Sequence, residues 1–162
     1  NFMIIRNATA DDLKEIAEVE KECFSAAEAA SEKQFSERLA VYPDHFWLLY
    51  DRDRLTAVVN GLVTDEEKLR DEMFEKASLH DEKGKWQMLF GVETVPEYRG
   101  RGCAGLLIRR VIEDAKKQGR TGIVLTCREK LISFYEKFGF RDEGISGSVH
   151  GGGIWHDMRL RF

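Results

Sequence analysis

The sequence predicts an α/β protein with a mixed central sheet of about six to seven strands flanked by helices, in a single domain over residues 1–162. Three observations support this. Strand-like runs and amphipathic helical stripes alternate through the second half of the chain. A glycine- and arginine-rich turn connects one of these strands to a helix. The 162 residues, of which 43% are hydrophobic, are enough for one core and too few for two.

The first half begins with a short strand at residues 3–6. Thr9 is the expected N-cap of an amphipathic helix that ends near Cys23. Ser31, followed three residues later by Gln34, has the pattern of a capping box and predicts a second helix. Two β-rich runs, at 46–50 and 55–63, flank a polar turn and predict a hairpin. Residues 64–85 are strongly charged and predict an exposed helix followed by a loop.

The second half alternates more regularly. Pro96 ends a strand at 86–95, and helices closed by Gly119 and Gly139 enclose a buried strand at 123–125. Two further strands are expected around the glycines at 151–153, the last of them at 154–160. This order calls for a parallel pair at the centre of the sheet and an antiparallel hairpin at its end.

Composition excludes several classes of protein. The formal net charge is −4, so the chain has no positive electrostatic field that would attract nucleic acid. No apolar run approaches the roughly 20 residues of a membrane span. Cys23, Cys103 and Cys127 form no CxxC or cysteine–histidine cluster, so neither a disulfide framework nor a metal site is expected. Free thiols are typical of a reducing compartment, and we expect a cytoplasmic monomer or homodimer.

The turn Arg99-Gly100-Arg101-Gly102, which leads into Cys103-Ala104, carries the clearest chemical signal. Backbone N–H groups at the start of a helix lack partners within the helix and carry the positive end of its dipole. Glycines let a phosphate approach these amides, and the arginines add positive charge. The pattern predicts a pyrophosphate cradle. The alternative is a solvent-exposed turn, and neither GxxxxGK[ST] nor GxGxxG is present.

Two motifs resemble those of a known family. Residues 99–104 are similar to the [Q/R]-x-x-G-x-[G/A] signature of the GNAT N-acetyltransferases, and Phe134-Tyr135-Glu136-Lys137-Phe138-Gly139-Phe140 resembles their second signature. Residues 22–24, 65–69, 79–80 and 125–129 are similar to the arylalkylamine (serotonin) branch. The resemblance implies splayed central parallel strands and direct transfer of acetyl from acetyl-CoA to the primary amine of a small molecule, such as an arylalkylamine.

The same resemblance implies the roles of individual residues. Tyr135 would be the general acid that protonates the departing thiolate, although an aromatic residue at helical spacing is also typical of a core. The residues expected to hold acetyl-CoA are Val92, Glu93, Thr94, Arg99, Gly100, Arg101, Gly102, Cys103, Ala104, Gly105, Ser133 and Tyr135.

No residue fits the role of general base directly. In the arylalkylamine branch histidines relay the proton, and here Met88 and Phe90 stand at the matching positions. Glu93 is the candidate base on this strand, but strand alternation turns its side chain away from those two unless a bulge re-aims it. The histidines at positions 80, 150 and 156 are alternatives that would act through water. Cys127 is more simply a small buried residue than a nucleophile.

Phe24, Phe35 and Trp155 are the candidates for an aromatic wall around the amine, and each is equally compatible with a core position. Two other functions stay open. An open groove would favour acetylation of a peptide amino terminus or of lysine, and the missing base is compatible with a noncatalytic acyl-CoA sensor.

Overall fold

The computed structural model describes residues 2–162, whose strands form two sheets. The first has the order β1-β2-β3-β6 and is antiparallel throughout. Its strands are β1 (Met3–Asn7), β2 (Phe46–Asp51), β3 (Arg54–Asn60) and β6 (Gly91–Thr94). The second has the order β4-β5-β7-β9-β8, in which β5 and β7 are parallel and the other neighbours antiparallel. Its strands are β4 (Val63–Thr64), β5 (Trp86–Leu89), β7 (Gly122–Cys127), β9 (His156–Arg161) and β8 (Arg141–Ile145).

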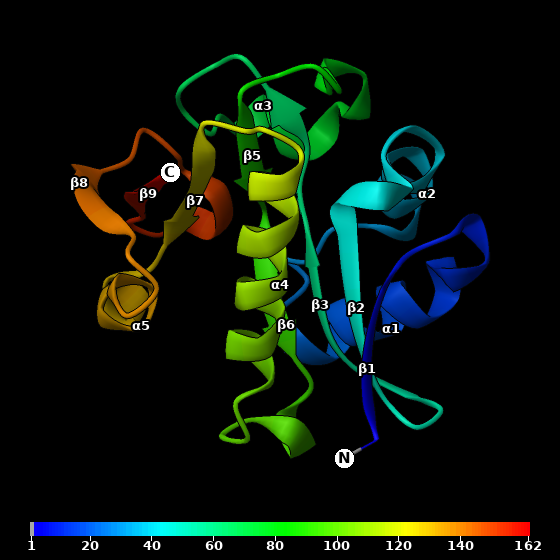
Figure 1. The fold of residues 1–162 in the computed structure, drawn as a ribbon. Helices are drawn as coiled ribbons and strands as arrows, with labels where there is room; N and C mark the ends of the chain where they lie inside the picture. Colours follow the sequence, from blue (N-terminus) through cyan, green and yellow to red (C-terminus); the bar gives the residue numbers. More distant parts are fainter. Residues whose placement is uncertain (1) are drawn as a thin grey trace.

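Helices cover both faces of these sheets (Figure 1). They are α1 (Leu13–Cys23), α2 (Glu32–Val41), α3 (Asp71–Glu75), α4 (Cys103–Lys117) and α5 (Ile132–Glu136). Helices α1 and α2 pack on one face through a cluster that includes Ile16, Phe35 and Met88. Helices α4 and α5 pack on the other through a cluster that includes Leu107 and Tyr135. The predicted fold class is confirmed.

Local sequence determines where the first helices begin. The Thr9 hydroxyl accepts a hydrogen bond from the Asp11 N–H, and Thr9 and Asp12 complete a capping box. The Ser31 hydroxyl accepts from the Gln34 N–H at 3.1 Å, while the Gln34 side chain accepts from the Ser31 N–H at 2.8 Å. Both predicted caps are confirmed. They could be predicted because each depends on residues within four positions of one another.

The two sheets part where β5 ends. The parallel pairing of β5 with β7 stops at Leu89 and Leu125. Beyond that point β6 pairs with β3 alone, and β7 pairs with β9. The run predicted as one strand, 86–95, is therefore two strands that belong to different sheets. The edge of β6 that faces β7 is left without a strand partner.

A β-bulge at Phe90 causes this change. The Phe90 N–H donates to the Asn60 carbonyl at 2.8 Å, while Gly91 is the register partner of the same Asn60. Two residues of one strand thus oppose one residue of the other, which reverses the alternation that follows. Met88 packs in the α1/α2 cluster and Val92 against the α4/α5 cluster. The Glu93 side chain consequently lies on the same face as Met88.

The charged segment 65–85, which we call the strap, is not the exposed helix that the sequence predicts. It contains only the five-residue α3 and a single 3-10 turn at Ala77–Leu79. Its sparse apolar side chains, Leu69 and Met73, are buried and pin it to the core. Backbone bonds from Asp81 to Val63 and from Thr121 to Lys85 fix its far end. None of the helices within residues 2–162 is long and apolar enough to cross a membrane.

Candidate active site

The predicted cradle is an uncapped helix start. Gly100 and Gly102 both have φ of +79°, a left-handed conformation that favours glycine. A Cβ placed on either would meet no atom within 4 Å, so the space above both backbones is open. Gly102 is the N-cap of α4 and offers no side chain to the amides that follow. These features fit a pyrophosphate group.

The side chains around the cradle support it without filling it. The Arg99 Nε–H donates to the Thr94 carbonyl at 3.0 Å, and the Arg101 guanidinium lies 4.6 Å from the centre of the Tyr98 ring. Both arginines are exposed beside the helix start. Cys103 is buried, and burial raises the pKa of its thiol, so its contribution to a phosphate site is its backbone amide.

Further residues predicted around the cofactor lie near the same end of α4. Gly105 is buried, and a Cβ there would stand 3.4 Å from the Phe138 ring, so the first turn of α4 passes close to the residues that follow α5. Ala104 is half-buried, and Ser133 is exposed on the first turn of α5. The structure thus brings the two predicted signatures together at one site.

Tyr135 lies inside the α4/α5 cluster, 6% exposed, with its ring against Phe134 and Phe140. Burial raises the pKa of its hydroxyl well above the usual value, and neighbouring Cys127 adds to this. The phenol therefore keeps its proton at any physiological pH. Burial likewise raises the pKa of Cys127 to about 11, which makes its thiol a poor nucleophile.

Two carboxyl groups meet between β6 and α1. Glu93 is 4% exposed, and burial together with a hydrogen bond from its carboxyl group to that of Glu20 raises its pKa well above the usual value. Glu20 is 5% exposed and also accepts a hydrogen bond from the Ala30 N–H at 2.7 Å. Glu93 therefore binds a proton more readily than an ordinary glutamate does.

Sequence reasoning missed Glu20, although a signal was available. It occupies the apolar stripe of α1, four residues after Ile16 and three after Ala17, where a charged side chain is unusual. A buried arginine completes this polar cluster. Arg38 donates to Asn60 Oδ1 at 3.1 Å and to the Phe74 carbonyl at 2.8 Å, and it faces Glu20 and Glu93 electrostatically.

Two loops meet above this face. The loop 146–155, which we call the roof, touches the α1–α2 loop at Glu28. His150 Nε2 lies 3.1 Å from the Glu28 carbonyl oxygen, and Arg128, whose guanidinium lies 4.1 Å from the Trp155 ring centre, pairs with the Glu28 carboxylate at 3.4 Å. Asp71 anchors the roof from below by accepting from the Ser148 hydroxyl at 2.6 Å and from the Val149 N–H at 3.1 Å.

The predicted aromatic wall is only partly present. Phe35 is 1% exposed in the α1/α2 cluster and packs against Phe46, so it is a core residue that cannot line a binding surface. Phe24 and Trp155 are half-buried, and the Trp155 indole N–H donates to the His150 carbonyl. Phe74 takes the place expected of Phe35, since its ring stacks between those of Phe90 and His150.

The three candidate histidines are engaged elsewhere. His150 holds the roof, and His156 Nδ1 pairs with Asp142 at 3.1 Å. His80 lies on the strap, where its Nδ1 accepts from the Val63 N–H and its Nε2 faces Glu82 at 2.9 Å.

His45, His80 and Glu82 place three potential metal-ligand atoms within 4.8 Å of one another. The Val63 N–H occupies His80 Nδ1, so the proton of a neutral His80 sits on Nε2 and points at Glu82. His45 Nε2 also faces Glu82, at 2.9 Å, and the Arg120 guanidinium pairs with the same carboxylate. His45 Nδ1 in turn lies 2.8 Å from Gln87 Oε1, so this cluster ties the strap to the residue that directly precedes β2.

The chain is similar to known acetyltransferases. Its residues 12–140 match the acetyltransferase (GNAT) family, and this match identifies the chain as an acyltransferase. The chain belongs to the GNAT family. It is 27% identical over 143 residues to a serotonin N-acetyltransferase of Mesocricetus auratus, a match that covers 86% of this chain and 68% of the hamster protein. Matches to other curated N-acetyltransferases span only 31% to 40% of their lengths.

Solved structures share the fold. The loading GNATL domain of CurA from Lyngbya majuscula superimposes with a TM-score of 0.85 at 15% identity, covering 99% of this chain and 98% of that domain. Arabidopsis thaliana Naa50, in complex with the bisubstrate analogue CoA-Ac-MVNAL, gives 0.77 at 16% identity and covers 100% of both chains. Among these relatives the acceptors named are both small and peptidic.

Proposed function

We propose that this protein transfers acetyl from acetyl-CoA directly to the primary amine of a small molecule. The single observation that carries the proposal is the pairing of an open, uncapped helix start with a buried acid, Glu93, on the face that the roof covers. The 27% identity to a serotonin N-acetyltransferase supports an arylalkylamine as one candidate acceptor.

The cradle would bind the donor. The main-chain amides at the start of α4 would hold the pyrophosphate, and the exposed guanidinium groups of Arg99 and Arg101 would add charge. The edge of β6 without a strand partner offers the backbone groups of Val92 and the N–H of Thr94 to the pantetheine amides, since the Thr94 carbonyl already accepts from Arg99. When bound, acetyl-CoA supplies an activated acetyl group as a thioester.

Glu93 would act as the general base. An amine reaches the site mostly as an ammonium ion, which must lose a proton before its nitrogen can bond to the acetyl carbon. A carboxylate whose pKa is raised accepts that proton more readily than an ordinary one. Glu20 would hold the Glu93 carboxyl group in place.

Tyr135 would act as the general acid. As the new carbon–nitrogen bond forms and the carbon–sulfur bond breaks, negative charge collects on the sulfur. The Tyr135 hydroxyl, which stays protonated because it is buried, would donate its proton to the departing thiolate. The phenol would then recover a proton from solvent.

A small acceptor is favoured over a peptide because the loops on either side of the acceptor face touch. The α1–α2 loop and the roof are bridged at Glu28 by His150 and Arg128. An extended peptide would need these loops apart, whereas a small amine would not.

A thiol-release assay with acetyl-CoA tests the proposal against a panel of arylalkylamines, aliphatic amines and short peptides. Release with small amines and none with peptides is the expected result. Release with peptides alone would replace the small-amine proposal. Tight acetyl-CoA binding by calorimetry, with no release from any acceptor, would instead identify an acyl-CoA sensor.

A further inference from the structure

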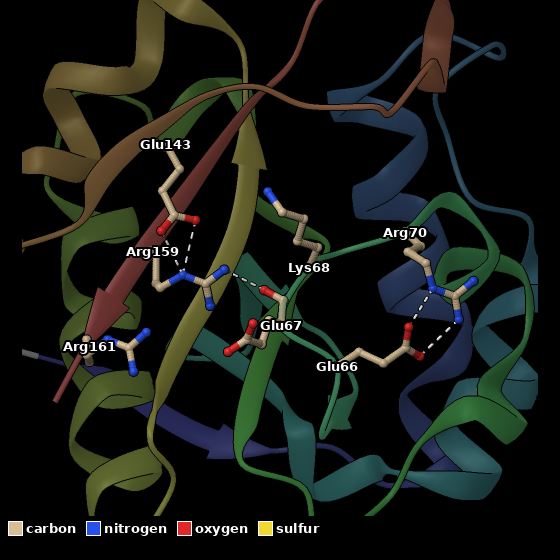
Figure 2. A pocket seen from close by; sticks show the side chains of 7 residues that line it. All are labelled: Glu66, Glu67, Lys68, Arg70, Glu143, Arg159 and Arg161. Carbon is tan, nitrogen blue, oxygen red and sulfur yellow. Dashed lines mark hydrogen bonds and ion pairs between the residues drawn. The ribbon is translucent and has the colours of Figure 1, made fainter.

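A small cavity lies between the strap and the start of the roof, beside the roof anchor. It has a volume of about 330 Å³ and is lined by strap residues 68–72, by residues 146–148 and by Asp157 of β9. A wider polar cavity of about 720 Å³ adjoins it, and Lys68 lines both. In the wider cavity Arg159 already pairs with Glu143, and Arg70 with Glu66 (Figure 2).

Asp157 is the unusual member of the smaller cavity. It is only 5% exposed, and its Oδ1 accepts no hydrogen bond from any group of residues 2–162. Its Oδ2 lies 3.6 Å from Lys68 Nζ, on a side chain that is itself 66% exposed. A buried carboxylate oxygen without a donor is costly, and a cation that reached it would remove that cost.

The other charged groups around the cavity are already paired, so Asp157 is the group that a cationic ligand would bind. Both carboxylate oxygens of Asp71 are occupied by the roof. Arg70 is neutralised by Glu66 at 2.7 Å and by Glu72 at 3.1 Å. Lys68 is the cation with which a ligand would compete, and its exposed side chain can move into solvent.

Asp157 lies on the same face of the sheet as the acceptor site. In the strand register Met88 pairs with Val124 and Val124 with Arg159, and the first two of these lie in the α1/α2 cluster. Asp157 is two residues before Arg159, so its side chain points to the same face. Its register partner, Thr126, lies one residue beyond the point where β7 leaves β5.

We propose that Asp157 binds a second, non-reacting cationic group of the acceptor, so that the enzyme prefers small amines carrying two positive charges. The proposal rests on the proposed function, since it assigns the acceptor of the same site. Glu93 accepts the proton of the reacting amine. The free oxygen of Asp157 and the hydroxyl groups of Ser146 and Ser148 bind the distal ammonium group.

Two acceptors that differ only in the second charge test this inference: cadaverine and n-pentylamine. In the wild-type protein KM for cadaverine should be lower by about tenfold or more, as expected for a charged hydrogen bond. Asp157→Asn should raise KM for cadaverine to that for n-pentylamine, with kcat and both n-pentylamine constants unchanged. Lys68→Met should lower KM for cadaverine, because it removes the competing cation.

Asp53→Asn, in the exposed turn between β2 and β3, is the matched control and should change nothing. Equal KM values for the two amines in the wild-type protein, or a preference that survives in Asp157→Asn, would overturn the inference. Calorimetric titration of cadaverine into the wild-type and Asp157→Asn proteins gives a readout without turnover. If no amine releases thiol but cadaverine binding depends on Asp157, the proposed function fails and the cation site stands.

Discussion

The carboxyl group of Glu93 on β6 is hydrogen-bonded to that of Glu20 on α1, and both are buried. The contact joins the strand that borders the opening between the sheets to the helix that precedes the α1–α2 loop. Glu20 also accepts from Ala30 at the end of that loop. The position of the acid and the position of the loop are therefore set by the same side chain.

Glu93→Gln should lower kcat/KM by about a hundredfold or more, since general base catalysis typically contributes that much. In the wild-type protein kcat/KM should rise with pH through an apparent pKa well above 4.5, the ordinary value for glutamate, and this rise should be absent from the variant. The measurement is a pH–rate profile with one amine for both proteins. Glu18→Gln, an exposed change on α1, is the control, and an unchanged profile in Glu93→Gln would exclude Glu93 as the base.

The same residue should make stability depend on pH. Because the pKa of Glu93 is higher in the folded than in the unfolded chain, the folded chain binds more protons between the two values. This contribution to the free energy of unfolding is complete below the unfolded pKa and is lost as pH rises through the folded one. Each pKa unit is worth about 1.4 kcal/mol.

Glu93→Gln should therefore have a higher Tm than the wild type at about pH 8, with the difference shrinking towards about pH 4. Thermal unfolding followed by circular dichroism across this range measures the effect. A variant that is less stable than the wild type at the alkaline end would contradict the assigned direction of the pKa change.

Tyr135→Phe should lower kcat by an order of magnitude or more and leave the Kd for acetyl-CoA nearly unchanged, since only the hydroxyl proton is lost. The aromatic packing with Phe134 and Phe140 is retained in the variant. Tyr50→Phe serves as the control. It removes a hydroxyl on the first sheet, far along the chain from the motif, that donates to Glu15 of α1. Normal turnover in Tyr135→Phe would leave Tyr135 a packing residue.

The cradle can be tested with a pair of glycines that share a backbone conformation. Gly102 and Gly119 have φ of +79° and +78°, at opposite ends of α4, and a Cβ on either meets open space. Alanine at either position should lower the free energy of unfolding by about 1–2 kcal/mol. Only Gly102→Ala should raise the Kd for acetyl-CoA, by about tenfold, measured by calorimetry. Equal Kd values in the two variants would show that the cradle does not hold the donor.

Sequence alone was sufficient where structure depends on near neighbours. The caps at Thr9 and Ser31, and the glycine turn before α4, all follow from residues a few positions apart. The strap was not predictable in this way. Its course depends on bonds such as the one from Thr121 to Lys85, which join segments distant in the sequence.

The acids at the site show the same limit. Alternation along 86–95 turns Glu93 away from Met88, and only the pairing of Phe90 and Gly91 with one residue, Asn60, reverses this. Asp157 gives no signal in sequence, because its importance lies in an oxygen that its neighbours in space leave unpartnered. Phe35 was ambiguous for a related reason, since an aromatic residue in a helical stripe can either line a binding site or pack in the hydrophobic core.

The bulge has one consequence beyond the opening between the sheets. A strand of the same length without the bulge would place Val92 beneath the roof and carry the Glu93 carboxyl group to the side of α4, where it would face leucine and isoleucine side chains. The pairing of two residues with Asn60, more than the chemical identity of Glu93, thus determines whether the acid and the amine share a compartment. A strand in which Phe90 and Gly91 opposed successive residues of β3 would retain every side chain proposed for catalysis and lose the arrangement that makes them useful.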